Sequence, residues 1–477
     1  MNTFIDAIDN QEARTLNDMK ARKSTMDANV DLFFKIGASR GKNIIPSFVA
    51  AFVENKEYAM RIVQWVRDIR GGAGERQLFK DILSYLEQTE PNLAIKLINK
   101  IPELGRWDDM LINYSNKNVE DYAFTLYKQA IKNENGLAAK WAPRKGLMAV
   151  KLRNFFKMTP KQYRKTLVNL TKVVETQMCK KEWDEIDFSA VPSLAHTRYK
   201  SAFQRNSVSY GKWVEALVKH EDPKVKINAG AVYPYDILKQ VILNMFGGWQ
   251  FKQFNISETE RNVIIEQWNV LPNYVNDAKV LPMVDVSGSM FGLARDKNVS
   301  PILVAISLGL YFAEKNTGDF KDVFLTFSGD PELVKLNGDI VQKIEQMGTS
   351  KWGMNTNLHK AFDKVLEMAV SKNVKSEDMP KTIIIFSDMQ FDNCVRFDDN
   401  ALEMIERKYN DAGYEVPNIV FWNINSHDNV PVKFNQSKTA LVSGFSPTIA
   451  KTILTNLEDL SPIKMMLNTI LDKRYDY

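Results

Sequence analysis

The chain has 477 residues, of which 44% are hydrophobic and 25% are charged. This is the composition of a globular protein, and it excludes a disordered, collagenous or membrane-embedded chain. One hydrophobic core rarely organises so many residues, so we expect two or three domains. No apolar run approaches the roughly 20 residues that cross a bilayer, and the first residues lack the apolar stretch of a signal peptide. Two cysteines and four histidines are too few for a disulfide framework or a standard zinc site. We therefore expect a soluble, cytoplasmic protein without a membrane partner.

The charge is distributed unevenly along the chain. Residues 1–275 carry 41 Lys and Arg against 31 Asp and Glu, a net charge of +10, and residues 276–477 carry 22 against 27, a net charge of −5. A basic half joined to an acidic half suggests that the first half binds a polyanion. Random drift between two domains is the alternative explanation.

The first part of the chain has helical periodicity. Apolar residues recur at spacings of three and four at Ala59, Ile62, Val63, Val66 and Ile69, and again through residues 78–86, with a glycine cluster at 71–74 between the two patterns. Further helical patterns lie near 92–100, 119–133, 161–180 and 209–219. Short helices joined by tight turns predict helix pairs stacked as a HEAT-like α-solenoid.

The periodicity changes near residue 275. Short apolar runs occupy 280–284, 323–327, 382–386, 418–422 and 439–442, and helical patterns lie between them at 302–314 and 358–369. Strands that alternate with helices predict a parallel, doubly wound α/β sheet. We place the domain boundary in the linker 271–273, so that residues 1–275 form the helical domain and residues 276–477 the α/β domain.

Polar residues follow two of the predicted strands and begin one predicted helix. Asp285, Ser287 and Ser289 come after the first apolar run, Asp388 follows the run at 382–386, and Thr356 precedes the helix at 358–369. In such a sheet the carboxyl ends of the strands meet at one edge, where ligands bind. Two carboxylates and three hydroxyls make an all-oxygen set, which suits Mg²⁺ or another divalent cation.

These five residues resemble the metal-ion-dependent adhesion site of von Willebrand factor A domains. The family pattern is DxSxS after the first strand, a threonine after a glycine-rich loop, and an aspartate after a later strand. The resemblance implies that Ser287 and Ser289 bind the ion directly, that Asp285 and Asp388 act through water, and that Thr356 acts directly or through water. It also implies an open position for an acidic group of a protein partner. The alternative is that the two aspartates are helix N-caps beside incidental serines.

A second resemblance covers nearly the whole chain. It rests on the segments 67–76, 105–109, 140–143, 191–195, 227–234 and 387–392. Together they resemble a family of plants, fungi and large phages in which a helical region precedes a von Willebrand A-type domain. That architecture is similar to the Ro/TROVE proteins, in which a ring of helical repeats binds RNA and a von Willebrand A domain completes the ring. The resemblance implies a ribonucleoprotein that binds structured or misfolded non-coding RNA.

Residues 138–165 are a candidate RNA surface, because they hold nine basic residues and no acidic ones. The basic residues are Lys140, Arg144, Lys145, Lys151, Arg153, Lys157, Lys161, Arg164 and Lys165. Basic side chains neutralise phosphates, and the interleaved Trp141, Phe155, Phe156 and Tyr163 either stack on unpaired bases or belong to the core. A second basic stretch contributes His196, Arg198, Lys200 and Arg205. The arginines around the glycine cluster either bind phosphate or pair with acidic residues between adjacent repeats.

No catalytic constellation is apparent in the sequence. A haloacid-type phosphatase would have a second aspartate where Ser287 stands, and no nucleophile elbow or phosphate-binding loop of standard spacing is present. We therefore predict a non-enzymatic RNA chaperone or scaffold with a magnesium-dependent ligand site. A protein–protein adaptor that captures an acidic residue at the metal site is the first alternative, and a metal-dependent phosphohydrolase is the second.

Overall fold

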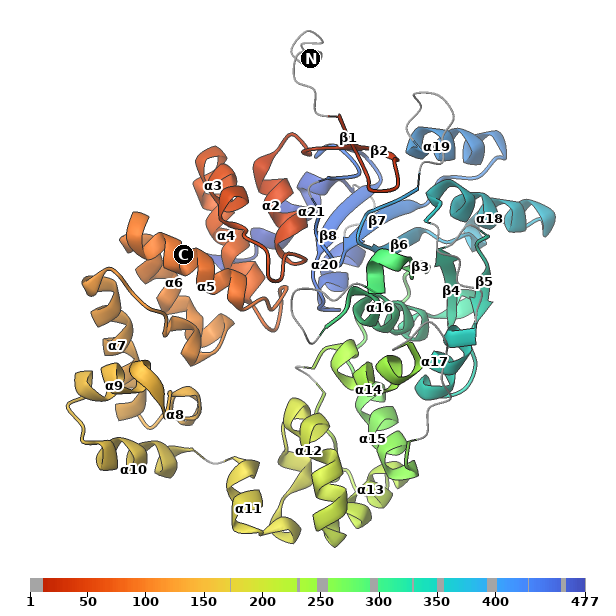
Figure 1. The fold of residues 1–477 in the computed structure, drawn as a ribbon. Helices are drawn as coiled ribbons and strands as arrows, with labels where there is room; N and C mark the ends of the chain where they lie inside the picture. The colour runs from red at the N-terminus through yellow and green to blue at the C-terminus, as the bar shows by residue number, and fades with distance from the viewer. Residues whose placement is uncertain are drawn as a thin grey trace. The chain divides into compact units, whose positions relative to one another are not determined.

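The computed structural model describes residues 12–171, 173–229, 232–246, 256–291, 299–327, 330–349, 356–392, 401–427, 429–455 and 460–476. The chain forms two compact units (Figure 1). Unit 1 comprises residues 1–62 and 229–472, and unit 2 comprises residues 63–228 and 473–477. Each unit is therefore assembled from two segments that are far apart in sequence. Within the described ranges, no helix combines the length and the apolarity needed to cross a membrane.

Unit 2 is helical, as the periodicity of its sequence predicts. The unit begins within helix α4 (Lys56–Arg67). The α-helices that follow are α5 (Gln77–Thr89), α6 (Pro91–Leu104), α7 (Lys117–Lys132), α8 (Gly136–Trp141), α9 (Gly146–Phe155), α10 (Pro160–Leu170), α11 (Val174–Lys180), α12 (Ser193–Asn206) and α13 (Val208–Lys219). Helix α5 packs on α6, and α6 packs on α7. Their apolar stripes form the interior, because Leu78, Ile82, Leu97 and Ile98 are all fully or almost fully buried.

One helix predicted near 161–180 is two helices. Helix α10 ends at Leu170 and α11 begins at Val174. Thr171 ends α10 in an extended conformation with its N–H donating to the carbonyl oxygens of Leu167 and Val168. The break contains no glycine or proline, so the sequence carries no strong signal for it.

Unit 1 contains the predicted α/β sheet. Its six strands are β3 (Val280–Asp285), β4 (Val323–Phe327), β5 (Leu333–Lys335), β6 (Thr382–Ser387), β7 (Asn418–Asn423) and β8 (Thr439–Ser443). They lie in the order β5-β4-β3-β6-β7-β8, and all neighbours are parallel except β5, which pairs antiparallel with β4. Numbered from β3, this is the order 3-2-1-4-5-6 of the doubly wound fold. The predicted fold class is confirmed.

Helices cover both faces of this sheet, as right-handed crossovers on either side of β3 require (Figure 1). The helices of unit 1 are α2 (Ala28–Ile36), α3 (Ile45–Glu54), α14 (Pro234–Phe246), α15 (Glu258–Asn269), α16 (Pro301–Lys315), α17 (Ile340–Thr349), α18 (Leu358–Ser371), α19 (Ala401–Asp411), α20 (Ile449–Thr455) and α21 (Pro462–Ile470). Helix α16 is buried from Pro301 to Ala313 and packs on β3, β4 and β6. The ring of Phe312 contacts Phe386 and Trp422, so this helix is the centre of the unit's core.

The N-terminal segment of the chain also belongs to unit 1. A short hairpin, β1 (Glu12–Arg14) and β2 (Lys20–Arg22), precedes α2, and α2 packs against β8. The N–H of Gly37 donates to the Ser443 hydroxyl (3.0 Å), and that hydroxyl donates to the carbonyl oxygen of Phe33 (2.9 Å). A Cβ atom at residue 37 would lie 2.5 Å from the Ser443 carbonyl oxygen, so this contact between helix and strand requires glycine.

Candidate functional site

The candidate metal residues lie where the strand order of the sheet reverses. Strands β3 and β6 are the central parallel pair, with Val284 opposite Phe386. Asp285 is the last residue of β3, and Asp388 directly follows β6. In doubly wound sheets this switch point, beyond the carboxyl ends of the strands, is where ligands bind.

Asp285 anchors the first half of the site. It is fully buried, its Oδ1 accepts a hydrogen bond from the N–H of Ser287 (2.9 Å), and its Oδ2 accepts one from the Ser387 hydroxyl (2.5 Å). These bonds hold the turn after β3 so that the hydroxyl oxygens of Ser287 and Ser289 lie 3.1 Å apart. Ser287 is buried and Ser289 is exposed. The DxSxS motif therefore gathers a carboxylate and two hydroxyls at the end of one strand.

The second carboxylate of the site lacks a full set of partners. Asp388 is fully buried, and its Oδ1 accepts a hydrogen bond from the N–H of Gln390 (3.3 Å). Its Oδ2 has no hydrogen-bond partner among the described residues and lies 3.5 Å from Nε2 of His427. Complete burial and, next in size, the charge of Asp388 raise the pKa of Asp285 well above its usual range. Two neighbouring buried carboxylates destabilise each other, and a bound cation would remove that penalty.

Thr356 is connected to the same edge of the sheet. It lies just before α18 and is fully buried. Its hydroxyl donates to the carbonyl oxygen of Gln390 (3.0 Å), and its N–H donates to Oδ2 of Asp392 (2.7 Å). Thr356 is thus bonded to the loop that carries Asp388. The glycine-containing loop that precedes it, residues 352–355, lies outside the described residues.

The donor set fits a hard divalent cation. Across the described residues, no three His, Cys, Asp or Glu side chains form a metal cluster. Carboxylates and hydroxyls that leave coordination positions for water are the environment that Mg²⁺ accepts. The residues able to hold it are Asp285, Ser287, Ser289, Thr356 and Asp388. Ser387, His427 and Asp392, which support them, were not singled out from the sequence, because each is defined by contacts between distant segments.

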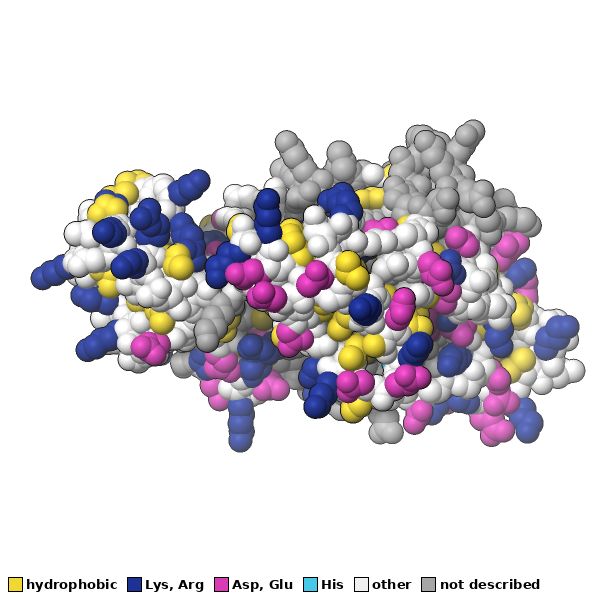
Figure 2. Space-filling view, turned by 90° about the horizontal axis from the view of Figure 1, so that it is seen from below, with side chains coloured by type: hydrophobic (Ala, Val, Ile, Leu, Met, Phe, Trp, Pro, Cys, Tyr) yellow, Lys and Arg dark blue, Asp and Glu magenta, His cyan; other side chains and the backbone are white. Residues whose placement is uncertain are grey.

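The basic segment 138–165 forms helices α8, α9 and α10 of unit 2. Its basic residues divide by exposure. Those that are exposed are Arg144, Lys145, Lys157, Lys161, Arg164 and Lys165, and those that are half-buried are Lys140, Lys151 and Arg153. Lys151 also forms an ion pair with Glu120 (2.9 Å). Figure 2 shows Lys and Arg gathered on the lobe at its left with little Asp or Glu beside them.

The aromatic residues of this segment belong mainly to the core. Phe155 packs edge-on against Phe124, Phe156 and Tyr163 are buried, and the Tyr163 hydroxyl donates to the carbonyl oxygen of Pro143. The guanidinium of Arg106 lies 3.6 Å from the centre of the Trp141 ring and covers it. Of the two readings that the sequence allowed, the structure therefore favours packing over base stacking.

The second basic stretch is only partly at the surface. Arg198 and Arg205 are exposed, but His196 and Lys200 of α12 are buried. The His196 ring packs among Phe203, Tyr210 and Trp213, and its Nε2 lies 3.0 Å from the Tyr210 hydroxyl. Burial lowers the pKa of His196 to about 4. In this conformation the expected RNA contacts of His196 and Lys200 are excluded by their burial.

The arginines near the glycine cluster make structural ion pairs. Arg67 and Arg76 both bind the buried carboxylate of Asp109, with distances of 2.6 Å, and Arg76 also pairs with Asp108. The guanidinium of Arg70 donates to the carbonyl oxygen of Glu103. The sequence left open whether these arginines bind phosphate or pair with acidic residues, and in the structure they pair with acidic residues and join adjacent helical segments.

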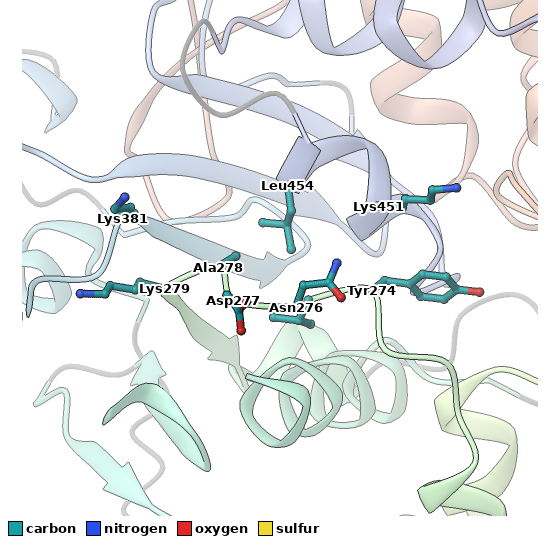
Figure 3. A pocket seen from close by; sticks show the side chains of 9 residues that line it. Tyr274, Asn276, Asp277, Ala278, Lys279, Lys381, Lys451 and Leu454 are labelled. Atoms are coloured by element: carbon teal, nitrogen blue, oxygen red, sulfur yellow. The ribbon is translucent and has the colours of Figure 1, made fainter. Parts of the chain in front are cut away.

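A cavity of about 400 Å³ lies at the opposite end of the sheet from the candidate metal residues. It is lined by residues 274–279, Lys381 and two residues of α20, Lys451 and Leu454. Figure 3 shows Lys279 and Lys381 on one side and Lys451 directed away from them. The ammonium group of Lys279 donates a hydrogen bond to the carbonyl oxygen of Glu377. Because the lysines do not converge, the cavity does not form an anion site.

Known proteins match the chain in both of its regions. Residues 123–281 match a domain of unknown function (DUF2828), and residues 279–467 match a second domain of unknown function (DUF7788). The uncharacterized protein L728 of Acanthamoeba polyphaga mimivirus is 30% identical over 523 residues, which cover 96% of this chain and 86% of that protein. The crystal structure of the Deinococcus radiodurans Ro (RSR) protein matches 92% of this chain and 93% of that chain, with 13% identity and a TM-score of 0.37.

Proposed function

We propose that this chain, which belongs to the family of the mimivirus protein L728, is an RNA-binding protein that acts as a chaperone or scaffold for structured or misfolded non-coding RNA. The observation that carries this proposal is the exposed basic surface of α8–α10. By this surface we mean Arg144, Lys145, Lys157, Lys161, Arg164 and Lys165, which are all exposed in a segment without acidic residues. Phosphate contacts of this kind supply affinity and little sequence specificity.

The packing of the aromatic residues refines this proposal. Because Phe155, Phe156 and Tyr163 pack in unit 2, base stacking contributes little at this surface. We therefore expect binding that depends on the backbone of the nucleic acid and that falls steeply with salt. Lys151 is left out of the surface, since Glu120 already neutralises it.

The test compares charge reversal on α10 with an equal change elsewhere. K161E/R164E/K165E alters three exposed residues of one helix, and K321E/K335E/K372E alters three exposed lysines of unit 1. Binding of a fluorescent single-stranded RNA is measured by anisotropy between 50 and 200 mM salt. The logarithm of affinity falls by about 0.7 per phosphate contact for each log unit of salt, so losing three contacts should flatten the slope by about 2. Equal effects of the two variants, or none from the first, would refute the proposed surface.

We further propose that Asp285, Ser287, Ser289, Thr356 and Asp388 hold Mg²⁺ or another divalent cation. Oδ2 of Asp388, which accepts no hydrogen bond from any residue that the structure describes, and the 3.1 Å separation of the two serine hydroxyls support this. When bound, the ion would supply an open coordination position for an acidic group of a protein partner. Ser287 and Ser289 would bind the ion directly, and Asp285 and Asp388 would orient its water ligands.

Titration with Mn²⁺, followed by calorimetry, tests the metal site without a partner. The wild-type chain should bind one equivalent, and S287A and D388A should each weaken binding at least tenfold. S371A, which alters an exposed serine at the end of α18, is the matched control and should bind as the wild type does. Binding that survives D388A unchanged would place the ion elsewhere.

A further inference from the structure

The tip of the N-terminal hairpin is bonded to the loop that carries Asp388. The tip comprises residues 15–19, between β1 and β2. The Thr15 hydroxyl donates to the carbonyl oxygen of Phe391 (2.5 Å), and the N–H of Leu16 donates to Oε1 of Gln390 (2.7 Å). Asp18 and Asp392 form an isolated β-bridge. These contacts join residues more than 370 positions apart in the chain, and all of them lie within unit 1.

Asn17 extends from this tip to the candidate metal site. Its Nδ2 donates to the carbonyl oxygen of Gln390 (2.9 Å) and lies 3.4 Å from the hydroxyl oxygen of Thr356. The orientation of the amide follows from these partners, because only its NH₂ group can donate to a carbonyl oxygen. Asn17 is nevertheless exposed. It therefore stands between solvent and a hydroxyl of the site.

The hydroxyl of Thr356 has a limited number of partners. It carries one proton, which it donates to the carbonyl oxygen of Gln390 (3.0 Å), with Oδ1 of Asp392 as a second, longer acceptor (3.4 Å), and it has two lone pairs. Asn17 occupies one lone pair at 3.4 Å, a long and weak contact. The other lone pair remains for a cation. A group at position 17 thus acts directly on an oxygen that the proposed site needs.

We propose that Asn17 is a rim residue of the metal site and that the hairpin tip covers the side by which a partner's carboxylate approaches. This inference rests on the metal site proposed above. The hairpin holds a neutral amide against Thr356 and leaves the coordination of the ion incomplete. A carboxylate from a partner then displaces Asn17 and supplies the charge that the amide lacks.

The substitution N17D tests the position of the side chain. Without metal, the new carboxylate meets the carbonyl oxygen of Gln390, so the hairpin bond is lost and amides 15–19 should exchange hydrogen faster. With Mn²⁺ alone as the probe, the added charge should strengthen binding about tenfold and restore slow exchange. L16D is the matched control, because Leu16 is 74% exposed and its side chain takes no part in these contacts.

The outcomes separate this inference from the proposal on which it depends. If the wild type binds Mn²⁺ and S287A does not, but N17D and L16D bind equally, the metal site stands and the role of Asn17 is refuted. If the wild type and N17D both fail to bind Mn²⁺, the metal site and the rim residue are refuted together. Tighter binding by N17D with unchanged L16D supports the inference.

Discussion

The buried ion pair of unit 2 offers the sharpest test of how its helical segments are joined. Asp109 is fully buried and Arg67 is 2% exposed. The carboxylate of Asp109 accepts hydrogen bonds from Nε of Arg67 (2.7 Å), from Nε of Arg76 (2.6 Å) and from the N–H of Arg106 (2.8 Å). Burial alone would raise the pKa of Asp109, but the charge of Arg67 and the bonds from Arg76 and Arg106 lower it.

The substitution D109A would leave the guanidinium of Arg67 buried without its partner. Removing one member of a buried pair costs about 3–5 kcal/mol. Asp108 is the matched control, because its side chain is 21% exposed and its pairs with Arg76 and Arg106 lie near the surface. For D108A we expect a loss of about 1 kcal/mol or less. The double substitution R67M/D109L removes both charges and should be milder than D109A.

Hydrogen exchange measured by mass spectrometry suits this comparison, since a chain of two compact units does not unfold in one step. A loss of 3 kcal/mol should speed exchange in the peptides of α4–α6 by about a hundredfold. Peptides of the sheet strands serve as the internal reference. If D109A and D108A accelerate exchange equally, or if R67M/D109L is as severe as D109A, the reasoning about an isolated buried charge is wrong.

Three further predictions concern single residues of unit 2. Burial lowers the pKa of His196 to about 4 from 6.5, so the unfolded state binds the proton more readily than the folded state. The free energy of unfolding should therefore fall by up to about 3 kcal/mol as the pH drops from 6.5 to 4. In hydrogen-exchange measurements on α12, H196F should remove this pH dependence, and an unchanged dependence would contradict the prediction. R474A deletes two bonds to the buried Asp68 and should cost about 2 kcal/mol. Faster hydrogen exchange in a peptide that covers residues 473–476 would report this loss, and wild-type exchange rates would refute it. G72A would place a Cβ atom 1.8 Å from the carbonyl oxygen of Trp65 and should destabilise α4 by about 1–3 kcal/mol. Hydrogen exchange in α4 peptides should become faster, and exchange at the wild-type rate would show that the backbone shifts to relieve the clash.

The central strands of the sheet were predictable because each is a continuous apolar run with polar residues at its end. The predicted strand at 323–327 has the observed bounds of β4, and those at 280–284 and 382–386 end one residue early. Strand β5 was missed, since Leu333–Lys335 is short, antiparallel and partly exposed. The hairpin β1–β2 was missed because its two strands have three residues each and little apolar content.

Side-chain roles were harder to predict than strands. Phe155 and His196 occur in basic stretches, and their sequence context did not distinguish an exposed ring from a packed one. Whether such a ring is packed depends on contacts with other helices. Phe155 packs against Phe124, and His196 packs against Trp213. The residues of the candidate metal site were found because strand ends in a doubly wound sheet converge. Asn17 carries no such positional signal.

Because unit 1 is built from two segments that are far apart in the chain, it cannot be completed until the second segment has been translated. The hairpin and α2 are translated before β8, the strand against which α2 packs. Residues 63–228 can gather their own helices in the meantime, because almost all of unit 2 lies between the two segments of unit 1. Until β8 has been translated, the apolar residues of α2 lack the strand against which they pack, so a chaperone can bind them during biosynthesis.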